Sequence, residues 1–170
     1  MKIIISETTK CQKFTILLQH LTQFTELINI TFSNEGVYFQ GLDGSHCCLF
    51  ECKINKEWFD SYEYVEKNPQ TNLGINIKIM YKILNIRKDN QSIEIYTTSK
   101  KDKLNVDLIS IDDNSSKNFD KFFEMPLFNI EIVNMNIVMD ETDVDLVIQS
   151  KRMCELMSEL ILFNQARASL

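Results

Sequence analysis

A histidine and three cysteines lie close together around residue 46. His46 directly precedes Cys47 and Cys48, and Cys52 follows after three further residues. Imidazole and thiolate groups are common zinc ligands, and a cysteine activated by a neighbouring base can act as a nucleophile. These residue types therefore raise two chemical hypotheses, a metal site and a thiol-dependent enzyme.

The residue counts and the spacing weigh against both hypotheses. The chain has two histidines and no Cys-x-x-Cys pair, whereas a zinc site needs converging ligands and a catalytic thiol needs an oriented base. On a strand, His46 and Cys48 would share one face and Cys47 would point to the other. We therefore expect no catalytic residue, no metal and no cofactor. The five cysteines are an odd number without framework spacing, which favours reduced thiols.

The composition is typical of a globular protein with an acidic surface. Of the 170 residues 44% are apolar and 25% are charged, and the formal net charge is −6. This length supports one domain and part of a second. The charge excludes nucleic-acid binding by the whole surface, so any DNA contact needs basic residues gathered on one face. Because the sequence shows no signal peptide and no apolar run of roughly 18 residues, we expect an intracellular protein without a membrane segment.

Hydrophobic periodicity divides the chain into two series of elements with the same order: a strand, a helix and three strands. The first series is predicted at residues 2–6, 10–24, 28–33, 36–42 and 46–54. The second series is predicted at residues 73–77, 78–87, 92–98, 103–111 and 121–128. A polar segment separates the two series, and a further strand and helix are predicted at 144–150 and 151–163.

The two predicted helices share an uncommon charge pattern. The first is expected to bury a stripe of Phe and Leu side chains, and the second to bury Ile79, Ile83 and Ile86. Neither carries an acidic residue, although acids outnumber bases by 24 to 18 in the chain. Such faces are either merely solvated or attract phosphate groups without reading bases. Their outward cationic and polar residues are Lys10, Lys13, His20, Lys78, Lys82, Asn85 and Lys88.

Three segments resemble the sliding-clamp family whose eukaryotic member is proliferating cell nuclear antigen. They are FSNEGVYFQGLDGSH at 32–46, WFDSY at 58–62 and GINIKIMYKIL at 74–84. The resemblance implies an α+β DNA-clamp fold with βαβββ repeated twice per domain, in which helices line the interior of a ring and sheets form its outside. The domains that it implies are an N-terminal clamp domain at 1–125, an interdomain connector at 126–143 and the incomplete start of a second clamp domain at 144–170.

The resemblance implies the function of a DNA sliding clamp, a processivity factor that encircles duplex DNA and catalyses no reaction. Its implied partners are double-stranded DNA without sequence specificity, a DNA polymerase and other PIP-box-type peptide ligands, a clamp loader, and further copies in a homotrimer of the full-length form. Its implied location is the nucleus or the site of DNA replication. A non-sliding clamp homologue, such as a checkpoint clamp subunit or a transcription-linked adaptor, stays open as the alternative.

Position within the family pattern also assigns roles to single residues. The outward residues of the two helices named above become DNA-facing, and Lys82 matches a DNA-facing lysine of the family. The implied partner-peptide groove is formed by Leu42, His46, Cys47, Ile137 and Met139.

The chain departs from the family pattern on two helices and in its length. The family's lysine positions on the first helix hold Thr15, Ile16 and Thr22, and Glu155 and Ser158 stand where the third helix often carries arginines. Because family subunits are longer, we expect a fragment, a truncated product or half of a split clamp that does not close a ring alone. The aromatic residues expected in the core at the end of the first domain are Phe119, Phe122 and Phe123.

Overall fold

The computed structural model describes residues 1–45, 47–64, 71–98, 103–111, 119–130 and 146–167. The chain divides into two compact units, Met1–Asn134 and Met135–Leu170. The division falls inside the predicted connector, and the assignment of the second unit as an incomplete clamp domain stays a prediction.

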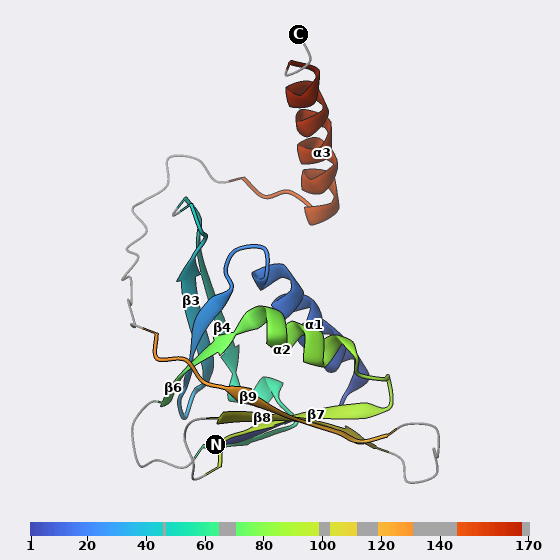
Figure 1. Cartoon of the computed structure of the whole chain (residues 1–170). Coiled ribbons are helices and arrows are strands. Elements are labelled where there is room, and N and C mark those ends of the chain that lie inside the picture. Colours follow the sequence, from blue (N-terminus) through green and yellow to red (C-terminus); the bar gives the residue numbers. More distant parts are fainter. Residues whose placement is uncertain (46, 65–70, 99–102, 112–118, 131–145, 168–170) are drawn as a thin grey trace. The chain divides into compact units, whose positions relative to one another are not determined.

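Two antiparallel sheets and two helices build the first unit (Figure 1). The five-stranded sheet has the order β5 (Ser61–Glu63), β1 (Lys2–Ile5), β7 (Gln91–Tyr96), β8 (Lys103–Ser110) and β9 (Lys121–Pro126). The four-stranded sheet has the order β4 (Leu49–Asn55), β3 (Gly36–Leu42), β2 (Leu27–Phe32) and β6 (Thr71–Asn76). The helices are α1 (Thr8–Leu21) and α2 (Ile77–Asn85), and a short 3-10 turn, η1, covers Lys56–Trp58.

The predicted repeat is confirmed, and the two repeats exchange their first strands. Strand β1 of the first repeat pairs with β7 of the second, with Ile3 opposite Ile95. Strand β6 of the second repeat pairs with β2 of the first, with Ile75 opposite Ile28. Each sheet therefore contains strands from both repeats, so neither repeat can complete its sheet alone.

Helix α1 begins at an interaction made by a distant residue. Glu7 makes no side-chain capping bond, and instead the carboxylate of Asp60 accepts the backbone N–H groups of Ser6 at 2.6 Å and Glu7 at 3.0 Å. The predicted stripe is buried at Phe14, Leu18 and Leu21. The helix ends before Phe24, which is 37% exposed and packs beside the ring of Phe50 at a centroid distance of 5.6 Å.

Helix α2 buries a different face from the one predicted. Its buried side chains are Ile77, Met80, Ile83 and Leu84. The prediction that Ile79 and Ile86 are buried is wrong, because these side chains are 41% and 46% exposed. The reason is the start of the helix: Ile77 directly follows the buried strand β6 and is itself fully buried, which fixes the helical phase. The side chain of Asn76 caps this start by accepting the N–H of Ile79 at 3.0 Å.

The strand predicted from His46 begins later, at Leu49. Leu42 pairs with Leu49, and the described residues between them, 43–45 and 47–48, form no strand and belong to the loop between β3 and β4. The backbone N–H groups of Cys47 and Cys48 donate to Asp43 Oδ1 at 2.8 and 2.7 Å, so they are not available for pairing with another strand. The strand prediction is therefore wrong for these two cysteines, and His46 lies outside the described residues.

The polar segment before β6 contains an element that periodicity does not reveal. Strand β5 pairs with β1, with Tyr62 opposite Ile3. The Tyr62 hydroxyl lies 2.7 Å from the carbonyl oxygen of Ser33 and 2.8 Å from that of Gly36, which joins β5 to the β2–β3 turn. Gly36 has a φ of 143°, and a Cβ there would lie 2.8 Å from the Lys56 nitrogen, so this turn requires glycine.

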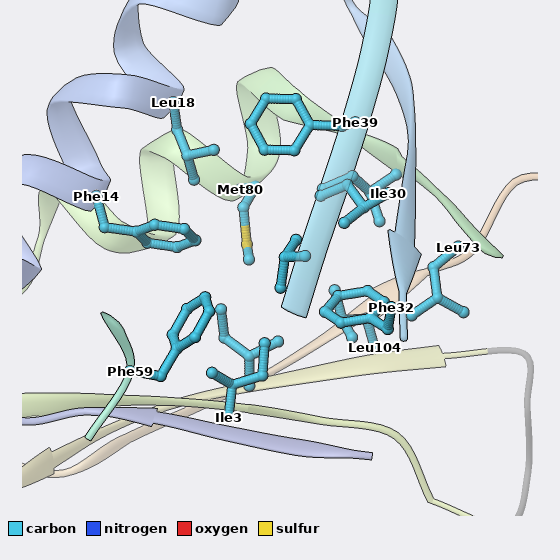
Figure 2. A pocket seen from close by; sticks show the side chains of 13 residues that line it. Ile3, Phe14, Leu18, Ile30, Phe32, Phe39, Phe59, Leu73, Met80 and Leu104 are labelled. Atoms are coloured by element: carbon cyan, nitrogen blue, oxygen red, sulfur yellow. The ribbon is translucent and has the colours of Figure 1, made fainter. Parts of the chain in front are cut away.

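The core fills the space between the two sheets and the two helices. Figure 2 shows side chains from both sheets and both helices meeting there, with Phe14 and Leu18 facing Met80 and Phe39. They enclose a cavity of about 20 Å³ that is lined only by apolar residues. Its size is close to that of one water molecule, but the lining offers no hydrogen-bond partner, so we expect it to be empty of water and without chemical function.

Two aromatic residues near β9 lie at the surface. Phe119 is 83% exposed and Phe122 is 68% exposed, so their predicted core positions are wrong. Alternation along β9 explains the exposure of Phe122, since Phe123 and Met125 point to the core and Phe122 points away, whereas Phe119 lies before the strand begins. Because β9 is the last strand of its sheet, no further strand within the described residues covers its outer edge.

The second unit is described from residue 146 to residue 167. The helix predicted at 151–163 is confirmed as α3 (Ser150–Arg167). The strand predicted before it is absent from residues 146–149, which have no regular structure. Several large apolar side chains of α3 are exposed, among them Leu160 at 56% and Ile161 at 57%. Among the described residues, we find no helix that is both long enough and apolar enough to span a bilayer.

Candidate functional site

Helices α1 and α2 pack side by side in the space between the two sheets (Figure 1). The predicted DNA-facing residues lie on them or, for Lys88, just after them. All are exposed except Lys10, which is half-buried. The structure therefore brings acid-free surfaces of both repeats onto one pair of neighbouring helices.

Lys10 is engaged in an ion pair. Its Nζ lies 2.6 Å from Asp60 Oδ1 and 3.9 Å from Glu7 Oε2. The hydrogen bond to Asp60 raises the pKa of Lys10. Burial alone would raise the pKa of Asp60, but the hydrogen bonds from Lys10 and from the backbone of Ser6 and Glu7 outweigh burial and lower it. This lysine therefore fastens the start of α1 to the segment before β5.

Lys78 is also paired, but loosely. Its Nζ lies 3.4 Å from Glu26 Oε2, and the side chains are 53% and 60% exposed. Exposed pairs of this kind contribute little stability and exchange partners easily. A phosphate group can therefore compete with Glu26 for this ammonium group, unlike the more tightly bound Lys10.

Three ammonium groups on this surface make no ion pair with any residue of the described ranges. They belong to Lys13 on α1 and to Lys82 and Lys88 at α2. His20 is exposed in the last turn of α1, and Asn85 accepts a long hydrogen bond of 3.5 Å from the Tyr81 hydroxyl. Free ammonium groups on neighbouring helices favour contact with phosphate oxygens.

An open groove of about 350 Å³, which sequence reasoning missed, lies between α1 and β4. Its only sequence signal is Trp58, the single tryptophan, whose ring packs 6.3 Å from Phe14 and 5.3 Å from Phe59. No carboxylate or imidazole is among the residues that line it, so the groove lacks an acid–base pair. The lining residues are Lys13, Phe14, Leu17, Lys53, Ile54, Asn55 and Trp58.

The described part of the predicted partner-peptide groove lies where β3 runs into the following loop. Leu42 is half-buried at the end of β3, and Cys47 is exposed in the loop. Asp43 organises the loop by accepting hydrogen bonds from Ser45, Cys47 and Cys48. The hydrogen bond from the Ser45 side chain is the main cause that lowers the pKa of Asp43 to about 2, and the backbone N–H groups add to it. The other groove residues, His46, Ile137 and Met139, lie outside the described residues.

The chain that leaves β9 is held against the four-stranded sheet. The backbone N–H of Phe128 donates to the carbonyl oxygen of Gly74 at 2.8 Å, and Asn29 Nδ2 donates to the carbonyl oxygen of Ile130 at 3.2 Å. A Cβ on Gly74 would overlap the Phe128 carbonyl group and lie 2.9 Å from the Ile130 side chain. Gly74 thus allows the start of the predicted connector to cross β6 in close contact, a role that sequence reasoning did not assign.

Metal binding finds no support in the described residues. No group of three or more His, Cys, Asp or Glu side chains lies close enough to hold an ion there. His46 is not among the residues searched, so the expected absence of a metal stays a prediction.

Comparison with known proteins identifies the family. The sequence model for the N-terminal domain of proliferating cell nuclear antigen matches residues 7–134. The chain belongs to this family. The matched residues include α1, α2 and the β3–β4 loop, so the surfaces described above lie within the family domain.

Two curated relatives agree with this assignment. The chain is 25% identical over 146 residues to proliferating cell nuclear antigen 2 of Plasmodium falciparum, covering 85% of this chain and 54% of that protein. It is 28% identical over 125 residues to a probable DNA polymerase sliding clamp 2 of Paramecium bursaria Chlorella virus 1, covering 74% of this chain and 42% of that protein.

The solved structures confirm the fold. A chain of the PCNA2–PCNA3 complex of Sulfolobus tokodaii matches 83% of this chain and 52% of its own length, with a TM-score of 0.70 and 18% identity. The PCNA of Thermococcus kodakaraensis matches 81% of this chain and 50% of its own length, with a TM-score of 0.69 and 17% identity. The chain thus has the predicted α+β clamp architecture and spans about half the length of the relatives it matches.

Proposed function

We propose that this chain acts as part of a DNA sliding clamp that encircles duplex DNA and raises the processivity of a DNA polymerase. The observation that carries the proposal is the surface of α1, α2 and the residues just after α2. In a chain with net charge −6, this part of the family domain presents Lys13, Lys82 and Lys88, which make no ion pair within the described part of the chain. Concentrating positive charge on neighbouring helices, within an otherwise acidic protein, suits a surface that faces DNA.

The lysines supply contacts without sequence readout. A lysine ammonium group is a mobile point charge that binds phosphate oxygens, and neither α1 nor α2 carries an arginine that could contact a base edge through two hydrogen bonds. Binding of this kind weakens steeply with salt concentration. Enclosure by a ring, in place of tight binding, then keeps the clamp on DNA while it slides.

Ring closure requires surfaces that pair with other domains. The outermost strands β9 and β4 each present one edge that no described strand covers, and such edges are ready to add a further strand. We infer a homotrimer in the full-length form, loaded onto DNA by a clamp loader at the site of replication, in the nucleus where the cell has one.

Partner enzymes would bind through short peptides. Leu42 ends β3 and Cys47 lies in the loop that follows, and the chain from Phe128 to Ile130 contacts β6 and β2 of the same four-stranded sheet. An apolar floor beside a connector fits a PIP-box-type peptide of a polymerase, whose apolar and aromatic anchors fill pockets. We infer that the clamp itself performs no catalysis.

Retention on circular DNA tests the proposal. The full-length protein, loaded on nicked circular duplex, should remain bound at a salt concentration that removes it from linear duplex of the same length. Linearising the circle with a restriction enzyme should release it. Equal retention on both forms would refute sliding and support the non-sliding clamp homologue. The small number of lysines on α1 that are free to bind phosphate also favours that alternative.

A further inference from the structure

The groove between α1 and β4 is also lined by η1. Its volume of about 350 Å³ falls within the range of ligand pockets, roughly 300–1,000 Å³. The α1–β4 groove adjoins Asn55 at the end of β4, whereas the loop with Cys47 joins β4 at its first residue, Leu49. These two ends of the strand are about 20 Å apart, so the α1–β4 groove is a separate site from the proposed partner-peptide groove.

The inner surface of the α1–β4 groove is apolar and firmly packed. The Phe14 side chain is 7% exposed, and its ring lies 6.3 Å from that of Trp58. The Trp58 ring also meets the ring of Phe59 edge to face at 5.3 Å. Leu17 and Ile54 are half-buried and pack against the core. An apolar anchor can therefore dock here without rearrangement of the core.

The charge of the α1–β4 groove is positive and unbalanced. Lys13 makes no ion pair with any described residue. Lys53 Nζ lies 3.3 Å from Glu51 Oε1, but both side chains are exposed, at 73% and 41%, and exposed pairs of this kind exchange partners easily. None of the residues that line the groove carries a carboxylate. The groove is therefore complementary to a negatively charged ligand.

Trp58 adds a hydrogen-bond donor that is free for a ligand. Within the described part of the chain, its indole N–H has no hydrogen-bond partner. Among the same residues, Ser110 is the one whose side chain has a buried oxygen or nitrogen without a partner, so the indole nitrogen is not buried. An indole N–H can only donate, and a carboxylate oxygen of a ligand is a suitable acceptor. The groove thus joins an apolar surface to several donors for anionic oxygens.

We propose that the α1–β4 groove is a docking site for a protein segment that carries an apolar side chain between carboxylates. The apolar side chain packs on Phe14 and Trp58, and the flanking carboxylates bind the ammonium groups of Lys13 and Lys53. Single-stranded nucleic acid is also negatively charged, but it needs an open aromatic face for stacking, and the Trp58 ring is half-buried against Phe14 and Phe59. This inference depends on the groove alone and does not require the clamp function.

The fluorescence of Trp58, the single tryptophan, reports on the groove directly. The chain is titrated with a short peptide that has a Leu-Phe pair between two runs of glutamate and contains no tryptophan. We expect a saturable change in Trp58 emission, with an affinity that falls as salt concentration rises, because salt screens exposed charges. One control peptide has lysines in place of the glutamates, and another has serines in place of Leu-Phe. With either control peptide, the emission change should be lost.

Charge-reversal variants assign the binding to this groove. Lys13→Glu and Lys53→Glu should each weaken the acidic peptide roughly fivefold or more. Lys56→Glu makes the same change in net charge at an exposed residue of η1 that does not line the groove, and it should leave the affinity unchanged. All three positions are exposed, so the circular dichroism spectrum should stay that of the wild type.

Three results would overturn the inference. They are equal binding of the glutamate and lysine peptides, equal affinities of the three variants, and an emission change with oligothymidylate but not with the acidic peptide. The last result would assign the groove to single-stranded nucleic acid. Retention on circular DNA tests the clamp function separately in each case.

Discussion

Removing the hydroxyl of Tyr62 should loosen the junction between β5 and the β2–β3 turn. The hydroxyl lies 2.7 and 2.8 Å from two backbone carbonyl oxygens, those of Ser33 and Gly36. Each of these oxygens keeps a second partner, because the Gly36 N–H donates to Ser33 and the Ser33 N–H donates to Gly36. No carbonyl is left wholly unsatisfied, so Tyr62→Phe should cost about 1 kcal/mol, the net worth of one hydrogen bond.

The magnitude translates into a measurable thermal shift. For a domain of this size, about 1 kcal/mol lowers Tm by roughly 3–6 °C. Circular dichroism melting and urea unfolding should report the loss. Tyr81→Phe is the matched control, since its exposed hydroxyl makes one long bond of 3.5 Å to Asn85 and its removal should leave Tm unchanged.

Tyr62→Phe should also change how the stability of the protein depends on pH in the alkaline range. Burial raises the pKa of Tyr62 to about 12, from an unfolded value of about 10. A raised pKa means that the folded state holds the proton more tightly, so this contribution is complete below pH 10 and disappears as pH rises through 12. Tyr62→Phe should lose this dependence. A variant as stable as wild type at pH 7, with the same alkaline unfolding curve, would refute the assignment.

Three further predictions follow from the surfaces described above. Gly74→Ala should break the contact with Phe128 at a cost of about 1–3 kcal/mol, seen as faster hydrogen exchange of the Phe128 amide, and unchanged exchange would contradict it. Lys82→Ala should weaken duplex binding by the full-length clamp and reduce the slope of log affinity against log salt concentration by about 1. Lys10→Ala should instead lower Tm and leave this slope unchanged. Equal slopes for the two variants would refute the difference between the two lysines. Asp43→Ala should speed hydrogen exchange of the β3–β4 loop amides. Lowering the pH of the wild-type protein through about 2, where Asp43 takes up its proton, should have the same effect. If the loop amides stay protected from exchange in the variant, Asp43 does not hold the loop.

The order of elements could be read from the sequence because it depends on local periodicity. Strands and helices of both repeats carry clear apolar patterns, and the structure confirms their order. Strand β5 was not predicted, because its three residues are too few to show an apolar periodicity. Its position is set by pairing with β1 and by the hydrogen bonds of the Tyr62 hydroxyl. The buried face of α2 was predicted wrongly because the helix has two possible apolar faces, one with Ile77 and Met80 and one with Ile79 and Ile86. Only the junction with β6 decides which of the two is buried.

The candidate site was predictable in its charge pattern but not in its pairing. The absence of acids from both helices is visible in the sequence, whereas the ion pair of Lys10 with Asp60 joins residues 50 positions apart. The backbone N–H groups of Cys47 and Cys48 donate to Asp43, only four and five residues away, and therefore take no part in a strand. The sequence did not indicate these hydrogen bonds, because the residues that follow favour a β-strand and the prediction extended that strand back to the cysteines. Phe122 lies on the face of β9 opposite to Phe123 and Met125, and only the packing of the sheet decides which of the two faces meets the core.

The two helices occupy equivalent places in the repeats, yet they are unequal as phosphate-binding surfaces. On α1, Lys10 is held by Asp60, and the hydroxyls of Thr15 and Thr22 donate to carbonyl oxygens of their own helix at 2.9 and 2.7 Å. These hydroxyls therefore do not replace the missing lysines as phosphate donors. Lys82 on α2 and Lys88 just after it make no ion pair with any described residue. DNA contact by this domain should accordingly depend more on α2 and the residues just after it than on α1. Replacing Lys82 and Lys88 should therefore reduce duplex affinity more than replacing Lys10, Lys13 and His20.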